Sequence, residues 1–140
     1  MLDHTRTKWE LLAYFHSKMS VVVWGILYFM YPPTLVVNEL GYTLLYVSTL
    51  LAISGSLLGM VGLWRSNSNN MNTRYQGLIL EFTGLLFAVG GPLGFFITSA
   101  HLTLELDEPQ LHTVTGVAYA LSAFIISRIF TVWRNLKAAS

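Results

Sequence analysis

The sequence predicts an all-α integral membrane protein with four transmembrane helices. Of its 140 residues, 54% are hydrophobic and only 11% are charged, and the mean hydropathy is +0.55. A soluble domain of average composition carries about 25% charged residues, because its surface faces water. This chain has too few charges to cover such a surface, so we expect lipid to surround part of it. The length predicts a single four-helix domain over residues 1–140.

Four segments are apolar and long enough to cross a bilayer, which takes about 20 residues. They cover approximately residues 11–31, 42–64, 75–100 and 111–133. The second segment contains no charged residue, and the third and fourth contain one each. The first is the weakest, because it is long enough only if Lys18 lies inside it. A secretory signal peptide is the competing interpretation of this segment, but no small-residue cleavage site follows it.

Prolines and polar residues mark the expected connections. Pro32 and Pro33 cannot continue a helix, so we expect them to begin a loop that ends near Gly41. Residues 65–74 are rich in Asn and Ser and predict a polar turn. Pro92 is expected to bend the third span in its outer half.

The basic residues predict the orientation. All eight fall on one side of a four-span arrangement, and they are Arg6, Lys8, Lys18, Arg65, Arg74, Arg128, Arg134 and Lys137. Lys and Arg are enriched on the cytoplasmic side of membrane proteins. We therefore expect both termini in the cytoplasm and a multi-pass location in the cytoplasmic membrane.

Small residues at helical spacing indicate close helix packing, which in lipid depends on small side chains and interhelical hydrogen bonds. The candidate packing residues are glycines of the second, third and fourth spans, namely Gly55, Gly59, Gly84, Gly90, Gly94 and Gly116. One interpretation is packing within a single four-helix bundle. The other is self-association through one of these faces, and the sequence leaves both open.

Three charged residues inside the spans form a predicted polar layer. Lys18, Glu81 and Arg128 each lie roughly 8–10 Å inside the cytoplasmic boundary, at about 1.5 Å of helical rise per residue. A charge at the centre of a membrane helix costs about 2.5–3.5 kcal/mol, so we expect Glu81 to pair with one or both basic residues. The alternatives to a structural ion pair are a proton relay and a polar pore lining.

The histidines suggest haem or metal binding only weakly. The stretch HSKMSVVVW at residues 16–24 is similar to the first haem-ligand helix of b561-type cytochromes. However, His16 is expected near the inner face of the membrane and His112 at the outer end of the fourth span, so one iron cannot take both. His101 and His112 lie at the outer interface near acidic residues and are weak candidates for a divalent metal site. We expect no cofactor.

Composition and motifs also exclude several function classes. The absence of cysteine excludes disulfides, iron–sulfur clusters and thiolate zinc sites. A net charge of +1 argues against a nucleic-acid partner. The sequence contains no nucleophile–base arrangement, phosphate-binding glycine loop or HExxH motif, so we do not expect an enzyme.

Roughly residues 75–137 resemble small multi-span membrane proteins of actinobacterial phages, which are often described as holin-like. The resemblance lies in GLILEFTG at residues 77–84, GGPL at 90–93 and VAYAL at 117–121, followed by Arg128 and a basic end. It implies a phage-encoded protein of the host cytoplasmic membrane that self-associates and forms a lesion. The alternative is an accessory or structural subunit of a larger membrane complex, including an electron-transfer or oxidase complex.

Overall fold

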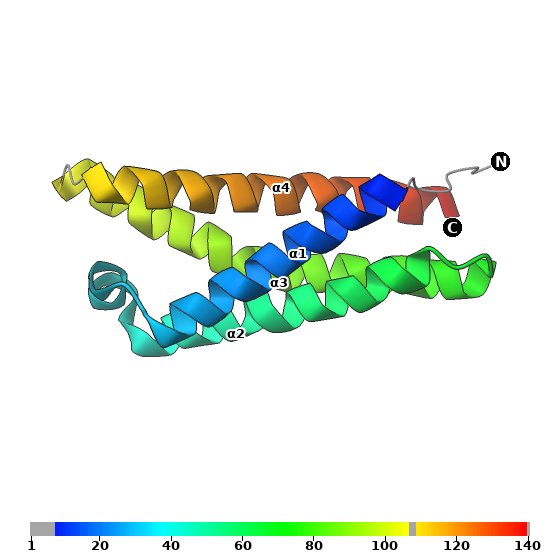
Figure 1. The fold of residues 1–140 in the computed structure, drawn as a ribbon, viewed down its shortest axis with the longest axis horizontal. Helices are drawn as coiled ribbons and strands as arrows, with labels where there is room; N and C mark the ends of the chain where they lie inside the picture. The colour runs from blue at the N-terminus through cyan, green and yellow to red at the C-terminus, as the bar shows by residue number, and fades with distance from the viewer. Residues whose placement is uncertain (1–7, 107–108, 140) are drawn as a thin grey trace.

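The structure is a computed structural model that describes residues 8–106 and 109–139. These residues form the helices α1 (Lys8–Met30), α2 (Thr34–Ser66), α3 (Met71–Leu106) and α4 (Pro109–Ala139), with no strand among them. Figure 1 shows that successive helices run in opposite directions, so both chain ends and the α2–α3 connection lie at one end of the molecule. Within the described ranges, four helical segments are long and apolar enough to cross a membrane, namely Trp9–Met30, Gly41–Ser66, Met71–Glu105 and His112–Ala138.

The helices extend beyond the predicted spans because polar flanking residues continue them. The clearest case is the start of α3, where Asn70 acts as a cap. Its Oδ1 accepts hydrogen bonds from the backbone N–H groups of Asn72 at 3.0 Å and Thr73 at 3.3 Å. Such a cap satisfies N–H groups that lack a partner at the first turn of a helix. The predicted polar turn at residues 65–74 is therefore reduced to the few residues between Ser66 and Met71.

The expected loop from Pro32 to Gly41 is wrong, because α2 already begins at Thr34. Pro33 precedes the first turn, where its fixed φ and missing N–H group do not oppose a helix. Gly41 then interrupts the helix with φ 73° and ψ 152°, a conformation that favours glycine. Residues 34–40 are thus a short helical segment of their own, and the membrane-length part of α2 starts at Gly41.

Helix α3 is the central element, because it packs against both α2 and α4. Pro92 lies inside it and provides no N–H group for the helical bond to residue 88. Figure 1 shows the yellow-green C-terminal part of α3 leaving α2 and leading to the start of α4. The bend expected from Pro92 fits this change of direction.

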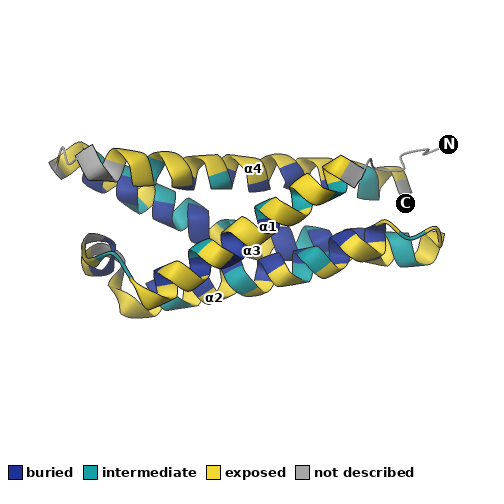
Figure 2. Cartoon of the chain, in the orientation of Figure 1, coloured by how far each residue is buried: buried dark blue, intermediate teal, exposed yellow. Residues whose placement is uncertain are grey.

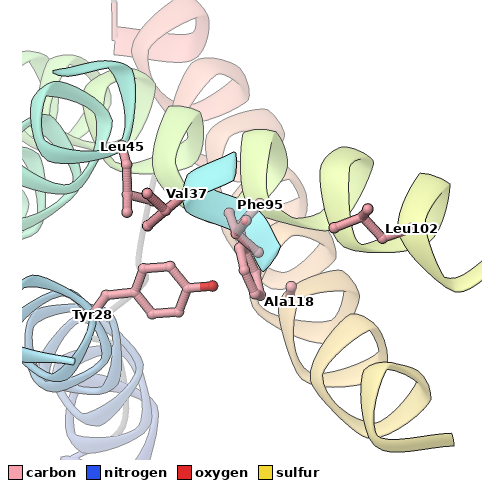
Figure 3. Packing of buried hydrophobic residues seen from close by; sticks show 7 residues of the cluster. Tyr28, Val37, Leu45, Phe95, Leu102 and Ala118 are labelled. Atoms are coloured by element: carbon pink, nitrogen blue, oxygen red, sulfur yellow. The ribbon is translucent and has the colours of Figure 1, made fainter. Parts of the chain in front are cut away.

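Two apolar clusters of buried residues hold the helices together, and Figure 2 shows the buried positions in dark blue. One lies at the end that contains the α1–α2 connection and is shown in Figure 3; it consists of Tyr28, Val36, Val37, Leu45, Phe95, Leu102 and Ala118. The other is nearer the chain ends and consists of Val21, Ala52, Leu78, Leu85, Ile125 and Val132.

The distribution of polarity differs from that in a soluble protein in two ways. Buried side chains include Lys18, Glu81 and Arg128, which are 4%, 0% and 2% exposed. Many large apolar side chains are exposed instead, among them Leu27, Leu50, Ile97, Val117 and Phe130. Scattered apolar residues are common on soluble proteins, but an apolar surface of this extent indicates contact with an apolar environment.

Candidate functional site

Lys18, Glu81 and Arg128 meet in a buried charge cluster, to which α1, α3 and α4 contribute one residue each. The Arg128 guanidinium donates from Nε to Glu81 Oε1 at 2.9 Å, and from Nη2 to Oε1 at 2.8 Å and Oε2 at 3.0 Å. Lys18 Nζ lies 3.3 Å from the same Oε1. The structure therefore brings all three predicted residues of the polar layer together around one carboxylate.

Two further residues complete this cluster. The Tyr14 ring lies under Arg128, with the guanidinium carbon 3.9 Å from the ring centroid. Such a cation–π contact is strongest where water is excluded. A Cβ atom at Gly59 would lie 3.3 Å from Lys18 Cε, so the glycine leaves room for the lysine chain. No motif in the sequence indicated a role for Tyr14, although this residue precedes Lys18 by one helical turn and therefore shares its face.

The charge cluster is suited to holding helices in register. Glu81 accepts three hydrogen bonds from a planar guanidinium fork, a geometry that fixes both position and direction. The formal charge of the three-residue cluster is +1, because two basic groups surround one carboxylate. Glu81 is fully buried, so in this arrangement it lines no opening.

The structure divides the candidate glycines into two groups. Gly55 and Gly84 face each other between α2 and α3: a Cβ on either would lie 2.5 Å from the carbonyl oxygen of the other. Gly62 and Gly77 are in equally close contact with the backbone of the facing helix. These glycines allow the α2 and α3 backbones to touch, and Gly59 shares this interface while also accommodating Lys18.

Gly90, Gly94 and Gly116 form the second group. Within the described part of the chain, nothing lies within 4 Å of a Cβ atom built on any of them. On α4, Gly116 begins an exposed row of small residues that continues through Ala120, Ala123 and Ser127. Their spacing of four, three and four places them on one face of the helix. This face of α4 has no partner helix within residues 8–106 and 109–139.

The histidines do not come together in a recognisable site. His101 Nε2 lies 3.4 Å from Glu105 Oε1, one turn along α3, and both side chains are more than half exposed. His112 is also exposed, while the acidic residues 107 and 108 lie outside the described residues. His16 Nδ1 lies 2.9 Å from the Leu12 carbonyl oxygen of its own helix. Among the residues with described placement, no group of three metal-ligating side chains occurs.

Comparison with protein-family models, curated proteins and solved structures gave no match. The residues of this chain therefore have to indicate its function by themselves. The two features that do so are the buried charge cluster and the exposed small-residue face of α4.

Proposed function

We propose that this chain is a holin-like, multi-pass protein of the cytoplasmic membrane that self-associates through the exposed small-residue face of α4. The exposed apolar surface supports insertion, since lipid is the environment in which exposed leucine, isoleucine and phenylalanine side chains are stable. The buried charge cluster supports it as well. Charged residues within membrane helices are expected to face the protein interior and pair with one another.

The distribution of basic residues supports an orientation with both termini in the cytoplasm. Arg65 and Arg74 flank the α2–α3 connection, and Arg134 and Lys137 lie near the end of α4. Figure 1 shows these two regions at the same end of the molecule. The positive-inside rule assigns that end to the cytoplasm.

Single cysteines test this orientation in a chain that contains no native cysteine. Asn38 and Asn69 are both exposed, near opposite ends of α2. In intact cells, an impermeant thiol reagent is expected to label Asn38→Cys and to leave Asn69→Cys unlabelled until the membrane is opened. Labelling of Asn69→Cys from outside, with Asn38→Cys protected, would reverse the proposed orientation.

The unfilled face of α4 is the observation that carries the self-association proposal. In lipid, helices associate where small residues let their backbones approach closely. The glycines between α2 and α3 already serve this purpose inside one chain. The row from Gly116 to Ser127 has the same spacing and small side chains, yet it is exposed in the single chain. A second copy can pack α4 against α4 without disturbing the bundle.

Lesion formation gives a direct test. Expression of the wild-type chain in a bacterial host is expected to collapse the membrane potential abruptly after a delay, because assembly depends on concentration in the membrane. Gly116→Ile and Ala123→Ile are expected to lengthen the delay or to abolish the collapse, since bulky side chains separate the backbones. A potential-sensitive dye measures the time of collapse, and chemical crosslinking of membranes measures the oligomer.

Ser54→Ile is the matched control, because Ser54 is a small, exposed residue of α2 outside the α4 face. It is expected to leave the time of collapse unchanged. High expression with no loss of potential, together with purification bound to a different protein, would instead identify an accessory subunit. An equal delay in all three variants would show that α4 has no special role.

A further inference from the structure

A groove of about 390 Å³ opens between α1 and α2 at the end that holds the chain termini. It is lined by Leu11, Leu12 and Phe15 of α1 and by Met60, Val61 and Trp64 of α2, among others. Its volume falls in the range of roughly 300–1,000 Å³ that is typical of sites for small molecules. The named lining side chains are all apolar or aromatic, so the groove favours an apolar occupant.

The groove exists because α1 leaves α2 along its N-terminal half. Tyr14 of α1 contacts Arg128 and lies 6.3 Å from the Phe124 ring, centroid to centroid, and both partners belong to α4. Figure 1 shows α1 crossing the bundle from α2 toward α4 in this direction. The contacts of Tyr14 with α4 therefore keep the N-terminal half of α1 away from α2, and the groove lies between these two helices.

A positive charge lies one residue beyond the groove lining on α2. Arg65 directly follows the lining residue Trp64, belongs to the last turn of α2 and is exposed. Within residues 8–106 and 109–139, no carboxylate lies within ion-pair distance of it. An apolar groove with an exposed arginine one residue beyond its lining complements a molecule with a long apolar chain and an anionic head.

We infer that this groove binds one acyl chain of an anionic phospholipid, with the phosphate at Arg65. This inference rests on the proposed membrane insertion, which brings the basic end of α2 to the level of the lipid head groups. A basic residue near the membrane surface contributes about 1 kcal/mol toward an anionic lipid. That energy corresponds to a roughly fivefold preference over a neutral lipid.

Fluorescence quenching of Trp64 by bromine-labelled lipids tests the inference. The background variant carries Trp9→Phe and Trp133→Phe and keeps Trp24 and Trp64. The same chain with Trp64→Phe in addition gives the fluorescence of Trp24 alone, which is subtracted. In bilayers of equal brominated content, brominated phosphatidylglycerol is expected to quench Trp64 with a relative association constant roughly fivefold that of brominated phosphatidylcholine. Arg65→Gln is expected to bring this ratio close to one.

Two controls separate a built site from general attraction to a basic surface. Arg134→Gln removes an exposed charge of α4 at the same end, and it is expected to leave the ratio unchanged. Val61→Phe fills the groove without changing the charge, and it is expected to lower the ratio toward one. A ratio near one in the background chain, or a preference that survives Val61→Phe, would overturn the inference. Absence of quenching by both lipids would instead contradict the proposed insertion.

Discussion

Glu81→Gln is expected to lower the free energy of unfolding by about 3–5 kcal/mol, because it leaves two buried cations without their shared counterion. The side chain keeps its size, so the loss comes from charge and not from a cavity. Glu81 accepts three hydrogen bonds from Arg128 and lies in ion-pair contact with Lys18. Stepwise addition of a denaturing detergent to protein in mild detergent, followed by tryptophan fluorescence, measures the loss.

Removal of either cation is expected to cost less than removal of the carboxylate, and the difference is larger for Lys18. Lys18→Met leaves a neutral Glu81–Arg128 pair with all its hydrogen bonds, so its expected cost is about 1 kcal/mol or less. Arg128→Met leaves the Lys18–Glu81 pair but removes the hydrogen bonds and the contact with Tyr14, and its cost should fall between the other two. Combining Arg128→Met with Glu81→Gln should restore part of the stability. Equal costs for the three single substitutions would show that the groups do not act as one electrostatic unit.

Gly84→Ala is expected to destabilise the bundle by about 1–3 kcal/mol or more, the usual cost of overpacking a tight contact. The added methyl group would lie 2.5 Å from the Gly55 carbonyl oxygen and from the Gly59 backbone nitrogen. Backbone atoms cannot rotate away as side chains do, so α2 and α3 must move apart. The same detergent titration measures the change.

Gly94→Ala is the matched control, since it makes the same substitution later in the same helix. No described atom lies within 4 Å of its added Cβ, so no clash is expected. Alanine is favoured over glycine in helices by up to about 1 kcal/mol, so this variant should match or exceed the wild type in stability. Equal destabilisation by both variants would mean that the glycines contribute to stability through the flexibility of the helix and not through the α2–α3 contact.

The four helices and the shared level of the three charged residues could be predicted from the sequence, because both depend on distance along the chain. The length of the apolar segments predicts the helices, and the helical rise predicts that Lys18, Glu81 and Arg128 lie at one level of the bundle. Gly41 shows the limit of this reasoning. A glycine after two prolines indicated the end of a loop, but in the structure it interrupts a helix that had already begun.

The sequence did not predict which small-residue faces pack inside the bundle and which are exposed. This depends on the direction in which each helix face points in the assembled bundle. Gly55 and Gly116 occur in the same kind of spaced pattern, yet the first is packed against α3 and the second is exposed. Tyr14 was missed for a related reason. Its contact with Arg128 arises because α4 packs over this part of α1, and no local sequence pattern predicts how these two helices cross.

The charge cluster also constrains the order in which the protein can be assembled. During translation Lys18 is synthesised first, then Glu81, and finally Arg128, which follows Glu81 by 47 positions. At about 5–20 residues per second, Lys18 is made several seconds before its counterion. Under the proposed insertion, the first helix keeps its ammonium group near water during that interval, since a long lysine chain can reach the interface from within a membrane. Stable burial of α1 therefore has to follow the arrival of α3, and the last helix to be translated completes the shared ion pair.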